Sequence, residues 1–168
     1  MSHPDEHPEL VHDPDAPQAG TATATRPLHL RPALLAAVAV GAIPGTALRW
    51  WVHGLLPTPP GGVPWATAAV NLAGAFLLGT LMEALAHRGP DAGRRQLVRL
   101  CAGTGFCGSL TTYSTLALEV LRTAQVSPEG PGNPLLTAVG YGLGSALLGV
   151  LAAGAGVWVA ARRGGGRS

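Results

Sequence analysis

The sequence contains no lysine, and charged residues make up only 12% of its 168 residues. Cysteine is also scarce, since Cys101 and Cys107 are the only two. Six residues apart on one segment, they would lie on different helical turns, beyond the reach of a disulfide. Two thiols alone are too few ligands for a metal site. We therefore expect both to pack as small apolar side chains, which excludes a disulfide scaffold and a thiol metal centre.

Charge is missing altogether from four long stretches, although hydrophobic residues make up 47% of the chain. These uncharged runs are Pro32–Leu48, Gly62–Met82, Leu100–Leu118 and Asn133–Ala161. Each is near or above the roughly 18–20 residues that cross about 30 Å of hydrocarbon. We expect the first to continue past Arg49 into Trp50 and Trp51, which suit the membrane interface. The sequence predicts an all-α integral membrane protein with four transmembrane helices over residues 32–163.

The two ends of the chain differ in composition from this domain. Residues 1–31 are rich in Pro, Asp, Thr and His and have no apolar periodicity. Such a segment cannot bury enough apolar surface to offset its ordering entropy, so we expect a disordered, solvated tail. It lacks the positive region and apolar core of a secretory signal peptide. Residues 164–168 are interpreted as a second, C-terminal tail.

The arginines favour one side of the membrane. With four spans, one side carries nine of them, namely Arg26, Arg31, Arg88, Arg94, Arg95, Arg99, Arg162, Arg163 and Arg167. The other side carries Arg49 and Arg122. Because positive charge concentrates on cytoplasmic loops, we expect both termini in the cytoplasm and the protein in the cell membrane, surrounded by lipid.

Glycines spaced four residues apart in two of these runs indicate close helix packing. Gly41 and Gly45 form such a face in the first run, and Gly140 and Gly144 form one in the last. Arg49 ends the first run. It is either an arginine that extends to the interface or a cation at a vestibule that gathers anions.

Several polar side chains fall inside the uncharged runs. Thr67, Asn71 and Gly74 share one helical face because their spacings are four and three. Asn71 is costly in a membrane helix, so it serves either an interhelical hydrogen bond or a pore, where its NH₂ could solvate an anion. Tyr141 and Ser145 are four residues apart and form a hydroxyl stripe, or an ordinary packing stripe.

The third run contains the most unusual stretch, Gly-Phe-Cys-Gly-Ser-Leu-Thr-Thr-Tyr-Ser-Thr at residues 105–115. Its glycines and hydroxyls suit a lipid-facing helix poorly, and irregular backbone at membrane depth survives only in contact with protein or a wet cavity. We expect a broken helix with exposed carbonyls, as in membrane ion sites. Residues 103–108 also match G-x-G-x-x-G, but no strand precedes them, so a dinucleotide site is rejected.

With these residues the chain resembles bacterial fluoride channels of the Fluc (CrcB) family. The resemblance rests on Gly45–Arg49, Asn71–Gly79 and Gly105–Thr115, and covers roughly Ala33 to Arg163. It implies an antiparallel dimer of four-helix subunits with two pores. It also implies a structural sodium ion, not transported, held by the backbone carbonyls of Gly108 and Thr111, which suits a hard cation.

The resemblance further implies roles for single side chains in anion passage. It places Asn71, Tyr141 and Ser145 on a polar track that Thr67 extends, with Arg49 and Glu119 at a vestibule. The ring edge of Tyr113 could face fluoride, because ring edges are the positive part of the aromatic quadrupole. The family usually has two phenylalanines, three residues apart, in this motif. This chain has Tyr113 and Leu116, so one ring is missing.

The function implied by the resemblance is passive, fluoride-selective efflux that lowers cytoplasmic fluoride. No catalytic constellation is found, and no nucleic-acid partner is expected. The strong arginine bias conflicts with an antiparallel homodimer, so we also consider a heterodimer with a related, oppositely oriented chain, in which this subunit conducts poorly or not at all. A small proton-coupled multidrug exporter is a further alternative, but it needs a mid-membrane carboxylate, and Glu83 and Glu119 lie near helix ends.

Overall fold

The computed structural model of the protein describes residues 31–58, 62–86, 91–125 and 133–164. The predicted N-terminal tail, apart from Arg31, lies outside the described residues, and so do residues 165–168. Within these ranges all regular structure is helical. The elements are α1 (Pro32–Leu55), α2 (Trp65–Ala86), α3 (Arg94–Val98), η2 (Arg99–Cys107), α4 (Gly108–Leu110), α5 (Tyr113–Gln125) and α6 (Pro134–Gly164).

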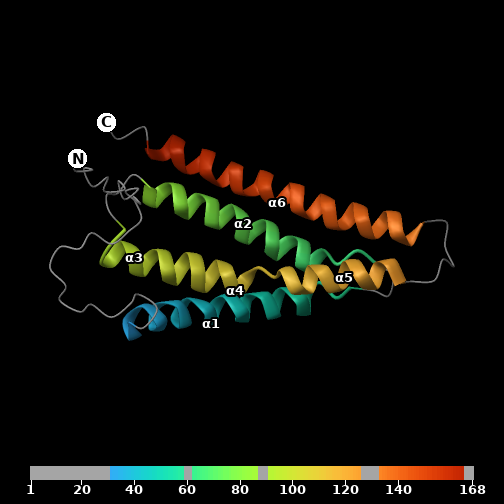
Figure 1. The fold of residues 1–168 in the computed structure, drawn as a ribbon, viewed down its shortest axis with the longest axis horizontal. Coiled ribbons are helices and arrows are strands. Elements are labelled where there is room, and N and C mark those ends of the chain that lie inside the picture. The colour runs from blue at the N-terminus through green and yellow to red at the C-terminus, as the bar shows by residue number, and fades with distance from the viewer. Residues whose placement is uncertain (1–30, 59–61, 87–90, 126–132, 165–168) are drawn as a thin grey trace, which may run out of the picture.

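Three of these helices, α1, α2 and α6, are long and apolar enough to cross a membrane (Figure 1). They correspond to the first, second and fourth uncharged runs. Helix α1 continues past Arg49 to Leu55, as the tryptophans after the run predicted. Helix α6 extends one residue into the expected C-terminal tail, since Gly164 is helical. Its start is fixed by the Oδ1 of Asn133, which accepts the N–H of Leu135 at 3.0 Å.

The segment that contains the third uncharged run is divided into four helical pieces. It begins with α3, just before the run, changes into the π-helix η2 and continues as α4, which ends at Leu110. After the extended Thr111 and Thr112 the chain becomes helical again as α5. The N–H of Gly108 donates to Gly103, five residues back, which is the bonding pattern of a π-helix. The run is therefore not a single helix of membrane-spanning length.

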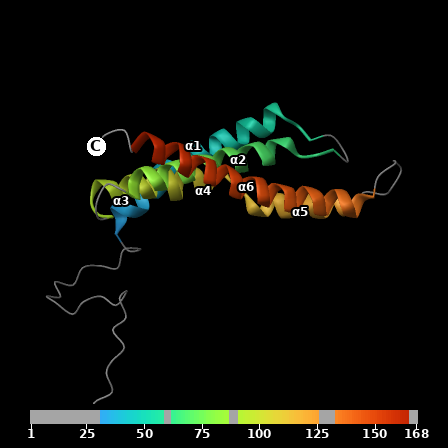
Figure 2. The same ribbon diagram turned by 90° about the horizontal axis from the view of Figure 1, so that it is seen from above.

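The two halves of this divided segment pack against different helices. Before Thr111, η2 and α4 lie against α1, and after Thr112 the main neighbour of α5 is α6 (Figures 1 and 2). The other large contact joins α2 and α6. The change from α1 to α6 as the main neighbour therefore coincides with the interruption at residues 111–112.

Glycines set the closest of these contacts. A Cβ added to Gly41 or Gly45 would collide with the backbone of η2, so the glycine face predicted for α1 is confirmed. A Cβ on Gly156 would collide with the backbone of α2. The glycine face predicted for α6 is wrong within the subunit, because a Cβ at Gly140 or Gly144 has nothing within 4 Å. The packing face of α6 lies elsewhere on its circumference.

The outer surface of the subunit is strongly apolar. Only 6% of the most apolar part of α6 is buried inside the protein. Large side chains such as Ile43, Trp50, Leu136 and Val150 are mostly exposed. A soluble monomer rarely exposes so much contiguous apolar surface. Lipid or another chain must cover these helices, as expected for a multi-pass membrane protein.

Candidate functional site

The predicted break lies at Thr111 and Thr112, inside the glycine- and hydroxyl-rich stretch. Thr111 has φ −79° and ψ 158°, an extended conformation that ends α4. Its N–H and its hydroxyl both donate to the carbonyl of Cys107, each at 3.0 Å. Thr112 then caps α5, because its Oγ1 accepts the N–H of Thr115 at 3.2 Å. The hydroxyls in this stretch therefore serve the backbone that the break exposes.

Asn71 of α2 pairs with the backbone of Thr112. The N–H of Thr112 donates to Oδ1 of Asn71 at 2.7 Å, and Nδ2 of Asn71 donates to the carbonyl of Thr112 at 3.1 Å. Thr112 is only 7% exposed, so its polar backbone groups need such partners. The sequence left open an interhelical hydrogen bond or a pore donor for Asn71. The structure shows the interhelical hydrogen bonds, and a pore role for the remaining N–H stays a prediction.

Gly108 and Thr111, the residues expected to supply carbonyls to a cation, lie beside this pair. In an unbroken α-helix the N–H of Thr112 would donate to the carbonyl of Gly108, four residues back. Instead it donates to Asn71, and Gly108 itself is exposed. The carbonyl of Thr111 accepts a long bond of 3.4 Å from Nη1 of Arg49. Arg49 therefore reaches the break rather than only the interface.

Glu119 of α5 joins the hydroxyls of two other helices. Its Oε1 accepts from Thr67 of α2 at 2.7 Å, and its Oε2 accepts from Tyr141 of α6 at 3.1 Å. The Tyr141 hydroxyl also lies 3.4 Å from the carbonyl of Pro64, and the side chain of Ser145, one turn further along α6, lies beside it. The sequence placed Glu119 apart from this track, yet the carboxylate is the shared acceptor at its centre.

The remaining predicted aromatic is not part of this cluster. Tyr113 is 84% exposed at the start of α5. Leu116, one turn later, is half-buried. The structure thus brings together Thr67, Glu119, Tyr141 and Ser145, gathers Asn71, Thr111 and Arg49 at the break, and leaves Tyr113 alone.

Three residues at the break were missed by the sequence reasoning. Thr112 provides the backbone that Asn71 binds, and Ser109 donates to the carbonyl of Ala42 at 3.0 Å, which joins α4 to α1. Gly74, placed only on the same face as Asn71, leaves room for the Thr111 methyl group, which a Cβ would overlap. The Thr-Thr pair after Leu110 was the available signal, because adjacent threonines suit an extended segment better than a helix interior.

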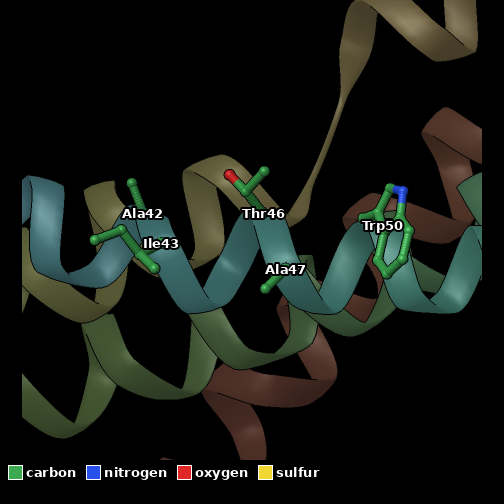
Figure 3. Close-up of a pocket in the computed structure, with 5 residues that line it drawn as sticks. All are labelled: Ala42, Ile43, Thr46, Ala47 and Trp50. Atoms are coloured by element: carbon green, nitrogen blue, oxygen red, sulfur yellow. The ribbon is translucent and has the colours of Figure 1, made fainter.

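A separate open groove runs along the outer side of α1. Ala42, Ile43, Thr46, Ala47 and Trp50 line it, and all five belong to this one helix (Figure 3). All of these side chains except Thr46 are largely apolar, and none of them belongs to the group formed by Thr67, Glu119, Tyr141 and Ser145. The groove therefore belongs to the apolar outer surface and not to the polar residues inside the subunit.

Polar side chains aligned inside an apolar helical shell, next to a broken helix, define a class of membrane protein that moves or binds ions. The comparison with known families gives the particular one. A family model described as "CrcB-like protein, Camphor Resistance (CrcB)" matches residues 36–157. This match covers most of the chain, and the protein belongs to this family.

Several curated relatives are similar over long stretches. The chain is 50% identical over 92 residues to "Fluoride-specific ion channel FluC 1" of Cutibacterium acnes, a match over 55% of this chain and 64% of that protein. It is 40% identical over 140 residues to "Fluoride-specific ion channel FluC 2" of Nocardia farcinica, over 80% of this chain and 94% of that protein. For "Fluoride-specific ion channel FluC 2" of Leifsonia xyli subsp. xyli the identity is 42% over 120 residues, or 71% of this chain and 81% of the relative.

Proposed function

We propose that this protein is a subunit of a fluoride-selective channel that lowers cytoplasmic fluoride by passive efflux. One observation carries the proposal: hydroxyl and amide donors from α2 and α6 line up inside an otherwise apolar subunit whose named relatives are fluoride channels. Hydrogen fluoride enters a cell as a neutral acid and loses its proton, so a passive anion pathway is sufficient to remove the trapped ion. No covalent chemistry is needed.

The proposed pathway uses hydroxyl and amide donors on α2 and α6. Thr67, Tyr141 and Ser145 each carry one hydroxyl proton, and Asn71 keeps a second N–H beyond the one given to Thr112. The hydroxyls of Thr67 and Tyr141 are directed at Glu119. A passing fluoride ion must therefore compete with this carboxylate for both protons, which makes Glu119 a control point on the path.

The proposal includes a fourth membrane crossing and an antiparallel dimer with two pores. Residues 94–125 would cross as the divided segment, with Thr111 and Thr112 near the middle of the bilayer. Support comes from the large apolar surface that the single subunit leaves uncovered, including the groove on α1. An intramembrane break also needs protein or water around it, which a second subunit would provide.

A structural sodium ion at the break is part of the same proposal. The donor chemistry fits a hard cation, because the Gly108 carbonyl does not receive the Thr112 N–H and the Thr111 carbonyl lies on the same break. The long bond from Arg49 leaves the second lone pair of the Thr111 oxygen available. When bound, sodium would supply positive charge that fixes these carbonyls in the assembled protein.

Fluoride efflux from liposomes tests the proposed function directly. Purified protein is reconstituted into vesicles loaded with potassium fluoride, and a potassium ionophore is added to balance charge. We expect these vesicles to release fluoride. Vesicles that contain the same protein but are loaded with potassium chloride should retain their chloride. Absence of fluoride release from vesicles that contain folded, dimeric protein would contradict a channel formed by this chain alone.

A second candidate is a poorly conducting partner in a heterodimeric fluoride channel. Leu116 favours it, because this side chain supplies no ring edge where the family has a second phenylalanine. The arginine distribution agrees, since α3, the start of η2 and the end of α6 carry five of the described arginines at one end of the bundle (Figure 1). Tags on both termini distinguish the two candidates, because a homodimer requires termini on both sides of the membrane. Flux from the protein alone, with mixed orientation, would exclude the heterodimer.

A further inference from the structure

Asn71 uses both ends of its carboxamide on one residue of the broken segment. Its Oδ1 accepts the N–H of Thr112 at 2.7 Å, and its Nδ2 donates to the carbonyl of the same residue at 3.1 Å. Two residues facing each other in a β-ladder exchange bonds in this way. Such a two-point contact fixes both the position and the orientation of the Thr112 backbone, which a single bond would not do.

The contact also determines what the Thr112 N–H does not bind. With helical dihedral angles at residue 111, this N–H would donate to the carbonyl of Gly108. The ψ of 158° at Thr111 turns it away, and Asn71 is the acceptor that makes this turn tolerable in a buried place. Gly108 is exposed, and around its Cβ position only the Gly103 carbonyl, at 3.9 Å, lies within 4 Å.

We propose that Asn71 is a positioning residue that keeps the Gly108 carbonyl available by holding the Thr112 N–H on α2. This inference rests on the cation site of the proposed function and goes beyond it, because it assigns Asn71 a role at the break in addition to the proposed anion contact of its remaining N–H. Loss of the carboxamide would leave the Thr112 N–H without its acceptor. The nearest replacement is the Gly108 carbonyl, which would close the break and remove a cation ligand.

The role can be separated from simple destabilisation by measuring sodium dependence. The full-length protein is purified in sodium-free buffer with N-methylglucamine, and its thermal unfolding midpoint is followed as sodium chloride is added. The variants are Asn71→Leu, which loses both bonds, and Asn71→Asp, which keeps only the acceptor for the Thr112 N–H. Thr80→Val is the matched control, because Thr80 also lies on α2 and bonds to Phe76 and Gly156 carbonyls away from the break.

We expect the wild-type midpoint to rise with sodium, and the half-maximal sodium concentration to increase roughly tenfold or more in Asn71→Leu. A tenfold change corresponds to about 1.4 kcal/mol. Asn71→Asp should fall between the two, and Thr80→Val should change the midpoint without changing the sodium concentration required. A wild-type midpoint that does not respond to sodium, or an unchanged sodium requirement in Asn71→Leu, would overturn the proposal.

If Asn71→Leu fails to fold, hydrogen exchange in the wild-type protein tests the pairing of Asn71 with Thr112 instead. The side-chain N–H of Asn71 bonded to Thr112 and the backbone N–H of Thr112 should both exchange slowly in sodium-free buffer. Exchange of either proton at the rate of an exposed amide would contradict the pairing. Fluoride efflux is measured separately, so a protein that responds to sodium as expected but conducts no fluoride would contradict a channel formed by this chain alone and leave the role of Asn71 standing.

Discussion

The hydroxyl of Thr67 donates to Oε1 of Glu119 at 2.7 Å and so joins α2 to α5. Thr67 is completely buried. A carboxylate among packed helices is costly unless its oxygens accept hydrogen bonds, so this contact is part of what allows Glu119 to lie inside the subunit. Few other direct contacts hold α5 to α2, since the main neighbour of α5 is α6.

Replacing Thr67 by valine keeps the shape of the side chain but removes the donor to Glu119. A hydrogen bond to a charged group contributes about 1.5–3 kcal/mol. We therefore expect the free energy of unfolding to fall by roughly this amount, and the unfolding temperature to fall with it. Fluoride efflux should fall as well, because one proposed anion donor is lost. Scanning calorimetry or a thermal shift assay in detergent measures the first effect, and liposome flux the second.

Thr67→Ser is the control for this substitution. Serine retains the hydroxyl and loses only a methyl group, so flux should stay near wild type even if stability falls slightly. Equal loss of flux in the serine and valine variants would show that the hydroxyl alone does not determine flux at this position.

Tyr141→Phe tests the second donor on Glu119. Phenylalanine keeps the ring on α6 and removes the hydroxyl that contacts Glu119 at 3.1 Å and the Pro64 carbonyl at 3.4 Å. We expect fluoride efflux to decrease about tenfold, which corresponds to about 1.4 kcal/mol in the barrier.

Ser145→Ala provides the comparison for Tyr141→Phe. Ser145 lies beside the Tyr141 hydroxyl but is not one of the two hydroxyl donors to Glu119, so the loss of flux should be smaller. A larger effect in Ser145→Ala would place the main anion donor one turn further along α6, and would contradict the central position given to Glu119.

The position of the break was predictable, whereas its partners were not. Glycine and hydroxyl content between Gly105 and Thr115 is a local property, and it correctly indicated that this run is not one helix. The pairing of Asn71 with Thr112 joins residues 41 positions apart and depends on how α2 is rotated against the break. The spacing of residues within one helix does not predict how that helix is rotated against another. The sequence therefore could not decide between an interhelical hydrogen bond and a pore donor for Asn71.

The same limit explains the other differences. Helical spacing showed that Tyr141 and Ser145 share a stripe, but not that Glu119 of another helix faces it. Four-residue spacing of Gly140 and Gly144 predicted a packed face, yet α6 packs through Gly156 against α2 and through Gly142 near Val120. Several glycines on one helix offer several possible faces, and only the neighbouring helices select among them.

Gly74→Ala should disturb the break through a single methyl group. A Cβ at this position would overlap Cγ2 of Thr111, the residue whose extended backbone ends α4. Overpacking of this kind costs about 1–3 kcal/mol, and we expect lower stability together with a weaker response to sodium. The measurement is again the unfolding midpoint with and without sodium chloride.

A second substitution tests the stated cause. Thr111→Ser removes the methyl group that Gly74→Ala would strike and keeps the hydroxyl that donates to the Cys107 carbonyl. The double variant should recover most of the lost stability. Gly54→Ala, at a helical glycine with open space around it, should be neutral or stabilising. Failure of Thr111→Ser to rescue Gly74→Ala would show that α2 and the break do not meet at this point.

Leu116→Phe tests whether the missing ring limits conduction. Leu116 is half-buried, one turn after Tyr113. Because part of this side chain is exposed, the larger phenylalanine side chain should fit at this position. A ring edge interacts favourably with an anion, and about 1 kcal/mol of added stabilisation corresponds to roughly a fivefold increase in fluoride efflux. Leu116→Met, of similar volume but without a ring, should leave flux unchanged.

If phenylalanine gives no increase in a protein that already conducts, the ring is dispensable in this chain, and Leu116 no longer favours a poorly conducting partner subunit. If the wild type is silent and Leu116→Phe conducts, the single leucine accounts for the loss.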